Sequence, residues 1–464
     1  MTSNSKPARI KQRRVQNLIK NSDSYSFFNL LTGPEMLSMV EQLLPEEHRE
    51  RQFPPTETLS MFLAQAMSED RSCQKAVIDA AVKRTVGGLS PCSTATGGYC
   101  QARKRLSLEM VSTLTRYAGE LMSRQIPEQW RWFGKRVHLI DGSTVTMPDT
   151  VANQAMYPQQ GGQQPGLGFP MVRIVGVICL SSGALLNAAL SSCWGKGSSE
   201  PQLLRSMLHT FSPGDLVMGD GYFASYFLLA WLAEAGVDGV FEQIGARRRV
   251  TDFRRGKRLG PRDHLVKLKK PKVKPDWMSQ EDYDSAPEHI TIREMKTKGK
   301  ILVTTLQSAT AFPKHEIKEL YKKRWHVEVD LRNIKTTLGM DILSCKTPQM
   351  IEKEIWVYFL AYNLIRLLMA QSALLADILP RQISFKHTVQ VWLAWSLHTQ
   401  IAGYPINDET LFVLIAQNIV GNRPGRVEPR ALKRRSKPFP LLMEQREKSR
   451  ENIRKHGHPK KIRA

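Results

Sequence analysis

The stretch that decides the fold is ELYKKRWHVEVDLRNIKTTLG, residues 319–339, which has the apolar period of an amphipathic helix. Pro313 suits the first turn of this helix, and Gly339 suits the position just past its end. At about 100° per residue its leucine, valine and isoleucine side chains gather on one face, which a globular core would bury. A second arc, about 60° wide, borders that face and carries polar residues. These residues are Tyr321, Arg324, Glu328 and Lys335.

A carboxylate held among cations at the edge of a core suits chemistry on a phosphodiester. Glu328 can bind a divalent cation, while Arg324 and Lys335 hold phosphate oxygens. The alternative is a solvated helix face on which Arg324 and Glu328 form an ordinary i,i+4 ion pair. The full spacing Tyr-x2-Arg-x3-Glu-x6-Lys fixes four positions, and its chance occurrence in a chain of this length is roughly one in a few hundred. We therefore favour the catalytic interpretation.

This spacing resembles the YREK signature of IS4-family transposases, the DDE enzymes of cut-and-paste bacterial insertion sequences. The resemblance implies two further aspartates, each at the end of a strand upstream. Asp141 follows the strand pattern of residues 137–140, and Asp220 ends the short apolar run of residues 214–220. Either aspartate alone could be a turn residue. Because both stand where the topology requires them, we predict that both belong to the site.

The order of elements around these aspartates is legible from the sequence. Beyond residue 130, short apolar runs separated by glycine and polar turns predict three strands with hairpin links, then helix, strand, helix and strand. The helix of Glu328 comes last. The resemblance supplies the name of this order, an α/β fold with an RNase H-like catalytic core, which we place at residues 131–343. Gly142, behind Asp141, permits a turn or a close approach of another segment.

A basic insertion interrupts the predicted core at about residues 245–300, where cations greatly outnumber acids. IS4-family enzymes are similar in having a largely β insertion between the second aspartate and the glutamate. The alternative is a solvated surface subdomain. So many cations would repel one another unless phosphates neutralised them, which favours contact with DNA.

The region before the predicted core is basic at its start and then has a helical pattern. Residues 1–25 form a basic arm, and residues 26–130 have the pattern of a helical DNA-binding domain. Within it, residues 93–105 resemble the turn and second helix of a helix-turn-helix, which makes Arg103 and Lys104 candidates for DNA contact. A helical hairpin with a basic end is the equal alternative.

The C-terminal part of the chain divides in two. Residues 344–422 predict a helical region apolar enough to pack on the core or on a second subunit, and the sequence does not choose between these. Residues 423–464 carry 15 Lys and Arg against 4 Glu. They form either a DNA-contacting arm or a solubilising tail, and the bias in sign favours the arm.

Composition limits the class of protein. The 464 residues carry a formal net charge of +24, which indicates a polyanionic partner and nucleic acid first, although a merely basic soluble protein shares this property. Six cysteines without zinc or disulfide spacing favour a reducing compartment. The N-terminus lacks the apolar core of a secretory signal. Polar residues within the apolar stretch 355–375 favour a buried helix over a membrane span. We expect a bacterial cytoplasmic protein, on the nucleoid when bound to DNA.

The resemblance also implies roles at the site. Asp141, Asp220 and Glu328 would hold two Mg²⁺ or Mn²⁺ ions, with Asp141 bridging them. Arg324 and Lys335 would grip phosphates near the scissile bond. Tyr321 would hydrogen-bond a phosphate as well, and Arg332 lies about 20° beyond it on the same face, where it can assist.

The implied partners are double-stranded DNA, both the terminal inverted repeats of the element and the target, and a second copy of the chain in a homodimeric synaptic complex. A further implication is a hairpin at the element end, formed when the freed 3′-hydroxyl attacks the opposite strand. Trp277, the only tryptophan of the insertion, is a candidate platform for a base flipped out of that hairpin, although a local core role is the more usual one for such a residue.

Two other functions share some of these features. A structure-selective nuclease with an RNase H-like fold would keep the three carboxylates, but it has no need of the Tyr321 to Lys335 spacing or of the basic insertion. A DNA-binding regulator derived from a transposase would keep the charge and typically lose a carboxylate. All three carboxylates are present here.

Overall fold

The computed structural model describes residues 42–43, 53–86, 88, 93–162, 164–195, 197–243, 251–402, 408–421 and 443–458. The basic arm expected at residues 1–25 lies outside this part of the chain. So does the expected C-terminal tail, apart from residues 443–458.

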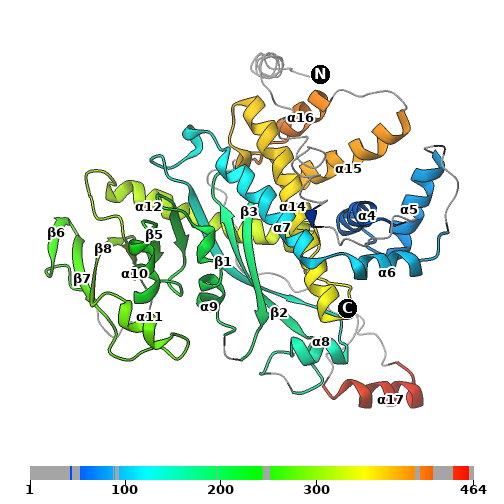
Figure 1. Cartoon of the computed structure of the whole chain (residues 1–464), viewed down its shortest axis with the longest axis horizontal. Coiled ribbons are helices and arrows are strands. Elements are labelled where there is room, and N and C mark those ends of the chain that lie inside the picture. Colours follow the sequence, from blue (N-terminus) through cyan, green and yellow to red (C-terminus); the bar gives the residue numbers. More distant parts are fainter. Residues whose placement is uncertain are drawn as a thin grey trace.

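A single mixed sheet of nine strands forms the centre of the described molecule, in the order β3-β2-β1-β4-β5-β9-β8-β7-β6 (Figure 1). Strand β1 pairs antiparallel with β2 and parallel with β4, and β4 pairs parallel with β5. From β2 onward, the chain order of strand, strand, helix, strand, helix and strand is the one predicted from the sequence, but the connection from β1 to β2 contains a helix, α8 (Val151–Met156), where a hairpin link was predicted. The strands are β1 Val137–Thr146, β2 Met171–Cys179, β3 Leu185–Ser192, β4 Leu216–Gly219, β5 Asp238–Glu242, β6 Lys257–Gly260, β7 Asp263–Lys269, β8 His289–Thr297 and β9 Lys300–Thr304.

The basic insertion continues the central sheet. Strand β9 pairs antiparallel with β5, with Val240 opposite Thr304, and β8, β7 and β6 follow outward in antiparallel order. Helix α11, Gln280–Ser285, lies between β7 and β8 in the chain. The insertion therefore forms one wing of the molecule, on the left of Figure 1.

Helices cover both faces of the core strands. On one face, α9 (Glu200–Arg205) and α10 (Tyr226–Glu234) bury their leucines against residues such as Ile140 and Val175. On the other face, α7 (Leu108–Arg124) and α14 (Pro348–Ala376) pack on the sheet residues Leu139 and Ile174. Alternate residues of one strand point to opposite faces, so each strand supplies both layers.

Helix α14 is the long central helix of the second layer. It is apolar and long enough to cross a membrane, but 83% of its most apolar window is buried inside the protein. It contacts α4, α7, α15 and α16, so its apolar surface is already covered by protein. The buried-helix interpretation of this stretch is therefore confirmed.

Smaller helices surround α14 on the right of Figure 1. They are α4 Pro55–Met67, α5 Cys73–Val86, α6 Gly97–Arg105, α15 Phe385–Ala402 and α16 Asp408–Gln417. Helix α8, Val151–Met156, follows β1, and helix α17, Arg446–His456, lies near it, where Arg446 pairs with Asp149.

The stretch that decides the fold is helical throughout, but it is not one regular α-helix. It consists of α12 (Lys314–Lys322), a 3₁₀ turn (Lys323–Trp325), α13 (His326–Arg332) and a π-helical turn (Asn333–Thr337). Gly339 ends it in the left-handed region, with φ +86°. The 3₁₀ and π turns advance by different angles from an α-helix, so the constant angle used to predict one polar stripe does not hold here.

Candidate active site

Asp141, on β1, and Asp220, directly after the neighbouring parallel strand β4, lie at the same level. The register pairs Leu139 with Met218, so two residues further along each strand the two aspartates face each other across adjacent strands. Adjacent strands lie about 4.8 Å apart. Asp141 was predicted to end its strand, but it does not, because β1 continues to Thr146 along β2 beyond the end of β4. The site therefore lies where β4 ends and β1 continues.

Each aspartate is held by a backbone amide. The amide of Gly142 donates to Oδ1 of Asp141 at 2.8 Å, and the amide of Tyr222 donates to Oδ1 of Asp220 at 2.8 Å. Both carboxyls keep their second oxygen for another partner. Gly219, which precedes Asp220, leaves room for Ile140 on β1, whose Cγ1 would lie 2.7 Å from a Cβ at that position.

Glu328 reaches the same neighbourhood from α13, which contacts β1. Its Oε1 accepts from Nη2 of Arg324 at 2.9 Å, and Nη1 of Arg324 lies 3.9 Å from Oδ2 of Asp141. Arg324 thus connects the glutamate to the first aspartate. The structure brings together these three of the residues predicted for the site.

Lys335 also reaches β1. Its ammonium donates to Oγ of Ser143 at 3.1 Å and to the carbonyl of Thr144 at 2.8 Å, next to Asp141. These bonds hold the π-helical turn against the strand.

Tyr321 was predicted to lie on a polar stripe bordering the core and to hydrogen-bond a phosphate. The residue is only 9% exposed and packs with the core, and its hydroxyl donates to the carbonyl of Gly219 at 3.2 Å. Because this hydrogen bond is made to the residue just before Asp220, Tyr321 helps to fix the backbone that carries the second aspartate. The 3₁₀ turn that follows it separates its face from that of Arg324.

The electrostatics of the site favour a bound cation. Burial raises the pKa of Asp141, and the neighbouring carboxylates of Asp220 and Glu328 raise this pKa further, whereas the Gly142 amide and Arg324 lower it. Three carboxylates that act on one another in this way carry more negative charge than Arg324 alone can neutralise.

The donor set fits a hard divalent cation. Among the described residues, no three His, Cys, Asp or Glu side chains are already arranged as a metal site. Carboxylate oxygens are nevertheless the ligands that Mg²⁺ and Mn²⁺ prefer. Arg324 engages one oxygen of Glu328 and the Gly142 amide one oxygen of Asp141, which leaves the others for a cation.

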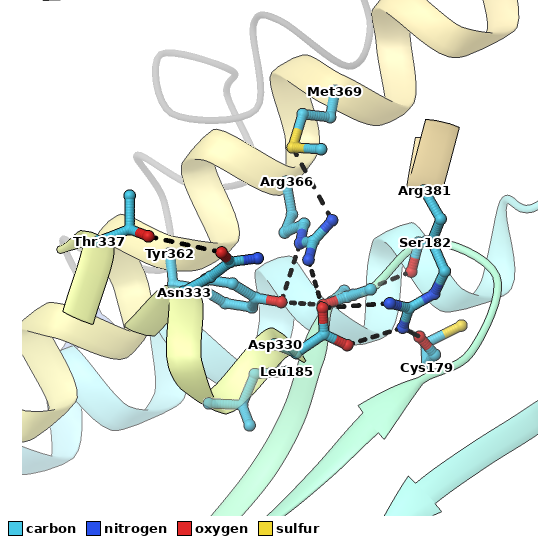
Figure 2. Close-up of polar contacts among 12 residues, drawn as sticks. Cys179, Ser182, Leu185, Asp330, Asn333, Thr337, Tyr362, Arg366, Met369 and Arg381 are labelled. Carbon is cyan, nitrogen blue, oxygen red and sulfur yellow. Dashed lines mark hydrogen bonds and ion pairs between the residues drawn. The ribbon is translucent and has the colours of Figure 1, made fainter. Parts of the chain in front are cut away.

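A buried ion network fixes the helix that carries Glu328. Asp330, fully buried, accepts from Arg366 on α14 and, with its other oxygen, from Nη2 of Arg381 at 2.7 Å (Figure 2). Tyr362 accepts from Nε of Arg366 at 2.8 Å, beside the same carboxylate. Asp330 and Glu328 are two residues apart, about 200° around the helix, so this network holds the side of α13 that faces away from the aspartates.

Other predicted DNA-contacting residues have different environments. Arg103 is a correction: it is 8% exposed, its guanidinium lies 4.5 Å from the centre of the Phe62 ring, and it donates to Gln65 at 3.1 Å. A side chain enclosed in this way is not available to DNA. Lys104 and Arg332 are exposed.

Trp277 packs on the outside of α10. It is 38% exposed, meets Phe227 edge to face, and has the guanidinium of Arg205 over its ring at 3.3 Å. One face of the indole is therefore covered by a cation.

Two residues that matter for the site were not identified from the sequence, Asp330 and Glu200. Asp330 lies in the quoted stretch, but its partners are 36 and 51 positions away in the chain. Glu200, at the start of α9, lies against Gly142. The only indication in the sequence that another segment approaches Asp141 was Gly142, because a glycine permits such a close approach.

Comparison with known proteins identifies the family. The model of the family described as "Transposase DDE domain" matches residues 132–364, which covers β1, β4 and α13. The chain belongs to the DDE transposase family. The chain is also similar to "Transposase InsG for insertion sequence element IS4" of Escherichia coli (strain K12), with 29% identity over 358 residues that cover 75% of this chain and 78% of the relative.

Among solved structures, the chain has a distant similarity to the "Cryo-EM structure of piggyBac transposase synaptic complex with hairpin DNA (SNHP)". It matches this transposase with a TM-score of 0.43 and 11% identity, over 88% of this chain and 87% of that one.

Proposed function

We propose that this transposase cuts and joins DNA at the ends of an insertion sequence by metal-dependent phosphodiester chemistry in a cut-and-paste reaction. The observation that carries the proposal is the convergence of Asp141 and Asp220 on adjacent parallel strands with Glu328 on the helix beside them. The strand order β3-β2-β1-β4-β5, with only β2 reversed against its neighbours, supports an RNase H-like core.

The roles of the side chains follow from their chemistry. Asp141, Asp220 and Glu328 would hold the divalent cations, Mg²⁺ or Mn²⁺, two per site. Such cations, when bound, activate the attacking water or 3′-hydroxyl and stabilise the leaving oxygen. Arg324 and Lys335, beside them, would bind phosphate oxygens and orient the scissile bond.

A basic surface at the same edge of the sheet supports DNA as the partner. Strands β4 and β5 end together, with Gly219 opposite Phe241, and β9 starts beside the end of β5. The β8–β9 turn therefore lies at the edge where Asp220 stands. Next to this turn is a hollow of about 350 Å³, lined by Arg262, Lys296, Thr297, Lys298, Gly299, Lys314 and Lys318. Phosphates of a duplex crossing the carboxylates would find cations there.

The test uses end-labelled DNA carrying the element's own terminal repeats, a target plasmid and Mg²⁺. We expect Asp141→Asn, Asp220→Asn and Glu328→Gln each to abolish cleavage while leaving DNA binding in gel shifts largely intact. Glu109→Gln, in the first turn of α7, is the matched control. Full cleavage by any of the three variants would remove that residue from the site.

The products separate the alternatives. Joined target products support a transposase, whereas cleavage that depends on DNA structure and yields no joining would indicate a nuclease. Binding without cleavage would indicate a regulator. We further propose that two copies, one per element end, act in the bacterial cytoplasm.

The second strand would be cut through a hairpin at the element end, with Trp277 as a platform for a flipped base. A base can stack on the face of the Trp277 indole that Arg205 covers only if Arg205 moves away. Burial lowers the pKa of Arg205 to about 10, so the charged guanidinium is less stable where it now lies than in water. Denaturing gels over time test this route. We expect transient hairpins, reduced by Trp277→Ala more than the first nick is. Double-strand breaks without hairpins would refute the route, and hairpins unaffected by the substitution would remove Trp277 from it.

A further inference from the structure

The glycine after Asp141 makes room for a fourth carboxylate. An ideal Cβ on Gly142 would lie 2.1 Å from Oε1 and 2.3 Å from Cδ of Glu200. Any other residue at this position would force the glutamate side chain away. Gly142 has no left-handed backbone conformation that would require glycine, so the close approach of Glu200 is what the missing side chain permits.

The helix that carries Glu200 does not by itself explain why the glutamate side chain points toward Gly142. Glu200 is the first residue of α9, after the N-cap Ser199, and an acidic residue there is favoured by the helix dipole wherever its side chain points. Its carboxylate instead turns onto β1 beside Asp141. Helix α9 packs on β2 and β3, and its first residue, Glu200, reaches Gly142 on β1, the strand that carries the first aspartate.

Glu200 shares the electrostatic field of the two aspartates. Burial raises the pKa of the Glu200 carboxyl, Arg173 lowers it, and Asp141 and Asp220 raise it again. The Glu200 carboxyl therefore lies close enough to both aspartates for their charges to act on it.

In the part of the chain that the structure describes, the Glu200 carboxylate makes no hydrogen bond or ion pair. Arg173, the cation near it, donates from Nη1 to the carbonyl of Ser198 at 2.5 Å, and its buried Nε has no partner. A half-buried carboxylate without a partner is costly. A cation bound between Glu200 and the aspartates would remove this cost.

Building on the function proposed above, we propose that Glu200 is a fourth carboxylate ligand of the divalent-cation site formed with Asp141 and Asp220. The site then draws oxygen ligands from β1, from the end of β4 and from the start of α9, in addition to Glu328. A further anionic oxygen ligand strengthens binding of Mg²⁺ or Mn²⁺, because ligand charge helps to set the affinity of such sites.

The test measures metal binding rather than turnover. Mn²⁺ is titrated into the full-length protein without DNA, and free Mn²⁺ is followed by electron paramagnetic resonance. We expect Glu200→Gln to lower the affinity for Mn²⁺ by at least about tenfold, because removing only the hydrogen-bond partners of metal ligands already costs about ten- to a hundredfold. Gly142→Ala should have a similar effect with every carboxylate retained, because its new methyl group displaces Oε1. Thermal melting without metal verifies that each variant is folded.

Two reference variants make the outcome decisive. Asp141→Asn should also lower the affinity, and Glu109→Gln, another acidic residue in the first turn of a helix, should not. Wild-type affinity and stoichiometry in Glu200→Gln, with a clear loss in Asp141→Asn, would overturn the role of Glu200 and leave the proposed function standing. No loss in Asp141→Asn would overturn both. An equal loss in Glu109→Gln would show an effect of net charge and would also overturn the role of Glu200.

Discussion

Replacing Asp330 by asparagine tests how the catalytic helix is held in place. The carboxylate is 0% exposed, and the side chains of its partners Arg366 and Arg381 are 3% and 12% exposed. Asp330→Asn removes the charge but keeps the shape, so two buried guanidinium groups lose their anion. Breaking a buried ion pair by removing one partner costs about 3–5 kcal/mol, because an uncompensated charge stays buried. We expect a loss of this size in the free energy of unfolding.

The measurement is a guanidinium unfolding curve, in which a lower midpoint at unchanged slope reports lost stability. Asp79→Asn is the control, because Asp79 pairs with Lys75 on the surface, with side chains 56% and 45% exposed, and such pairs contribute less than about 1 kcal/mol. The double variant Asp330→Asn with Arg381→Met should recover part of the lost unfolding free energy, because it removes one of the two buried guanidinium groups left without an anion.

The same substitution should affect cleavage. Because Asp330 holds the side of α13 opposite to Glu328, its loss should reduce cleavage at temperatures where the variant is still folded, with DNA affinity little changed. A stability loss no larger than that of Asp79→Asn, together with normal cleavage, would refute this account of the network.

Three further substitutions follow from single contacts. In thermal melts, Gly339→Ala should destabilise the protein clearly more than Gly299→Ala does. Both glycines have positive φ, but of the two only Gly339 would bring its new Cβ against a side chain, Nη2 of Arg71 at 1.8 Å. Equal losses of stability would contradict this. Tyr321→Phe should lose about 1 kcal/mol of stability and some cleavage at unchanged salt dependence of DNA binding, whereas a lower salt dependence would indicate a phosphate contact instead. Arg324→Ala should lower the slope of log affinity against log salt by about 0.9, and an unchanged slope with normal cleavage would reduce Arg324 to a structural ion pair.

The sequence was sufficient for features that one segment reveals by itself. The order of the core strands β1 to β5 and of the helices between β3 and β5 follows from local apolar runs and turn residues, and the structure contains it; the helix α8 between β1 and β2 was not predicted. The spacing from Tyr321 to Lys335 led to the DDE transposases, the family whose model matches residues 132–364. Such patterns are local because each element repeats with its own period.

The errors came from treating an element as regular or isolated. Asp141 was expected at the end of a strand, but pairing with β2 carries β1 on to Thr146, from Gly142 opposite Val175 to Thr146 opposite Met171. Arg103 was a candidate for DNA contact, with a helical hairpin as the equal alternative, but Phe62 and Gln65 of α4 enclose it. In both cases the neighbouring element decided the environment, and that element is not visible in the local pattern.

What the sequence by itself determined is therefore the family signature, the type and order of the elements in the core and the identity of three acidic residues. The tertiary structure alone decided which side chains meet: Glu200 at Gly142, Tyr321 under Asp220, and Asp330 between Arg366 and Arg381. The physical reason is that periodicity records whether a side chain faces the core or the solvent. Which groups it contacts there depends on how elements far apart in the chain pack together.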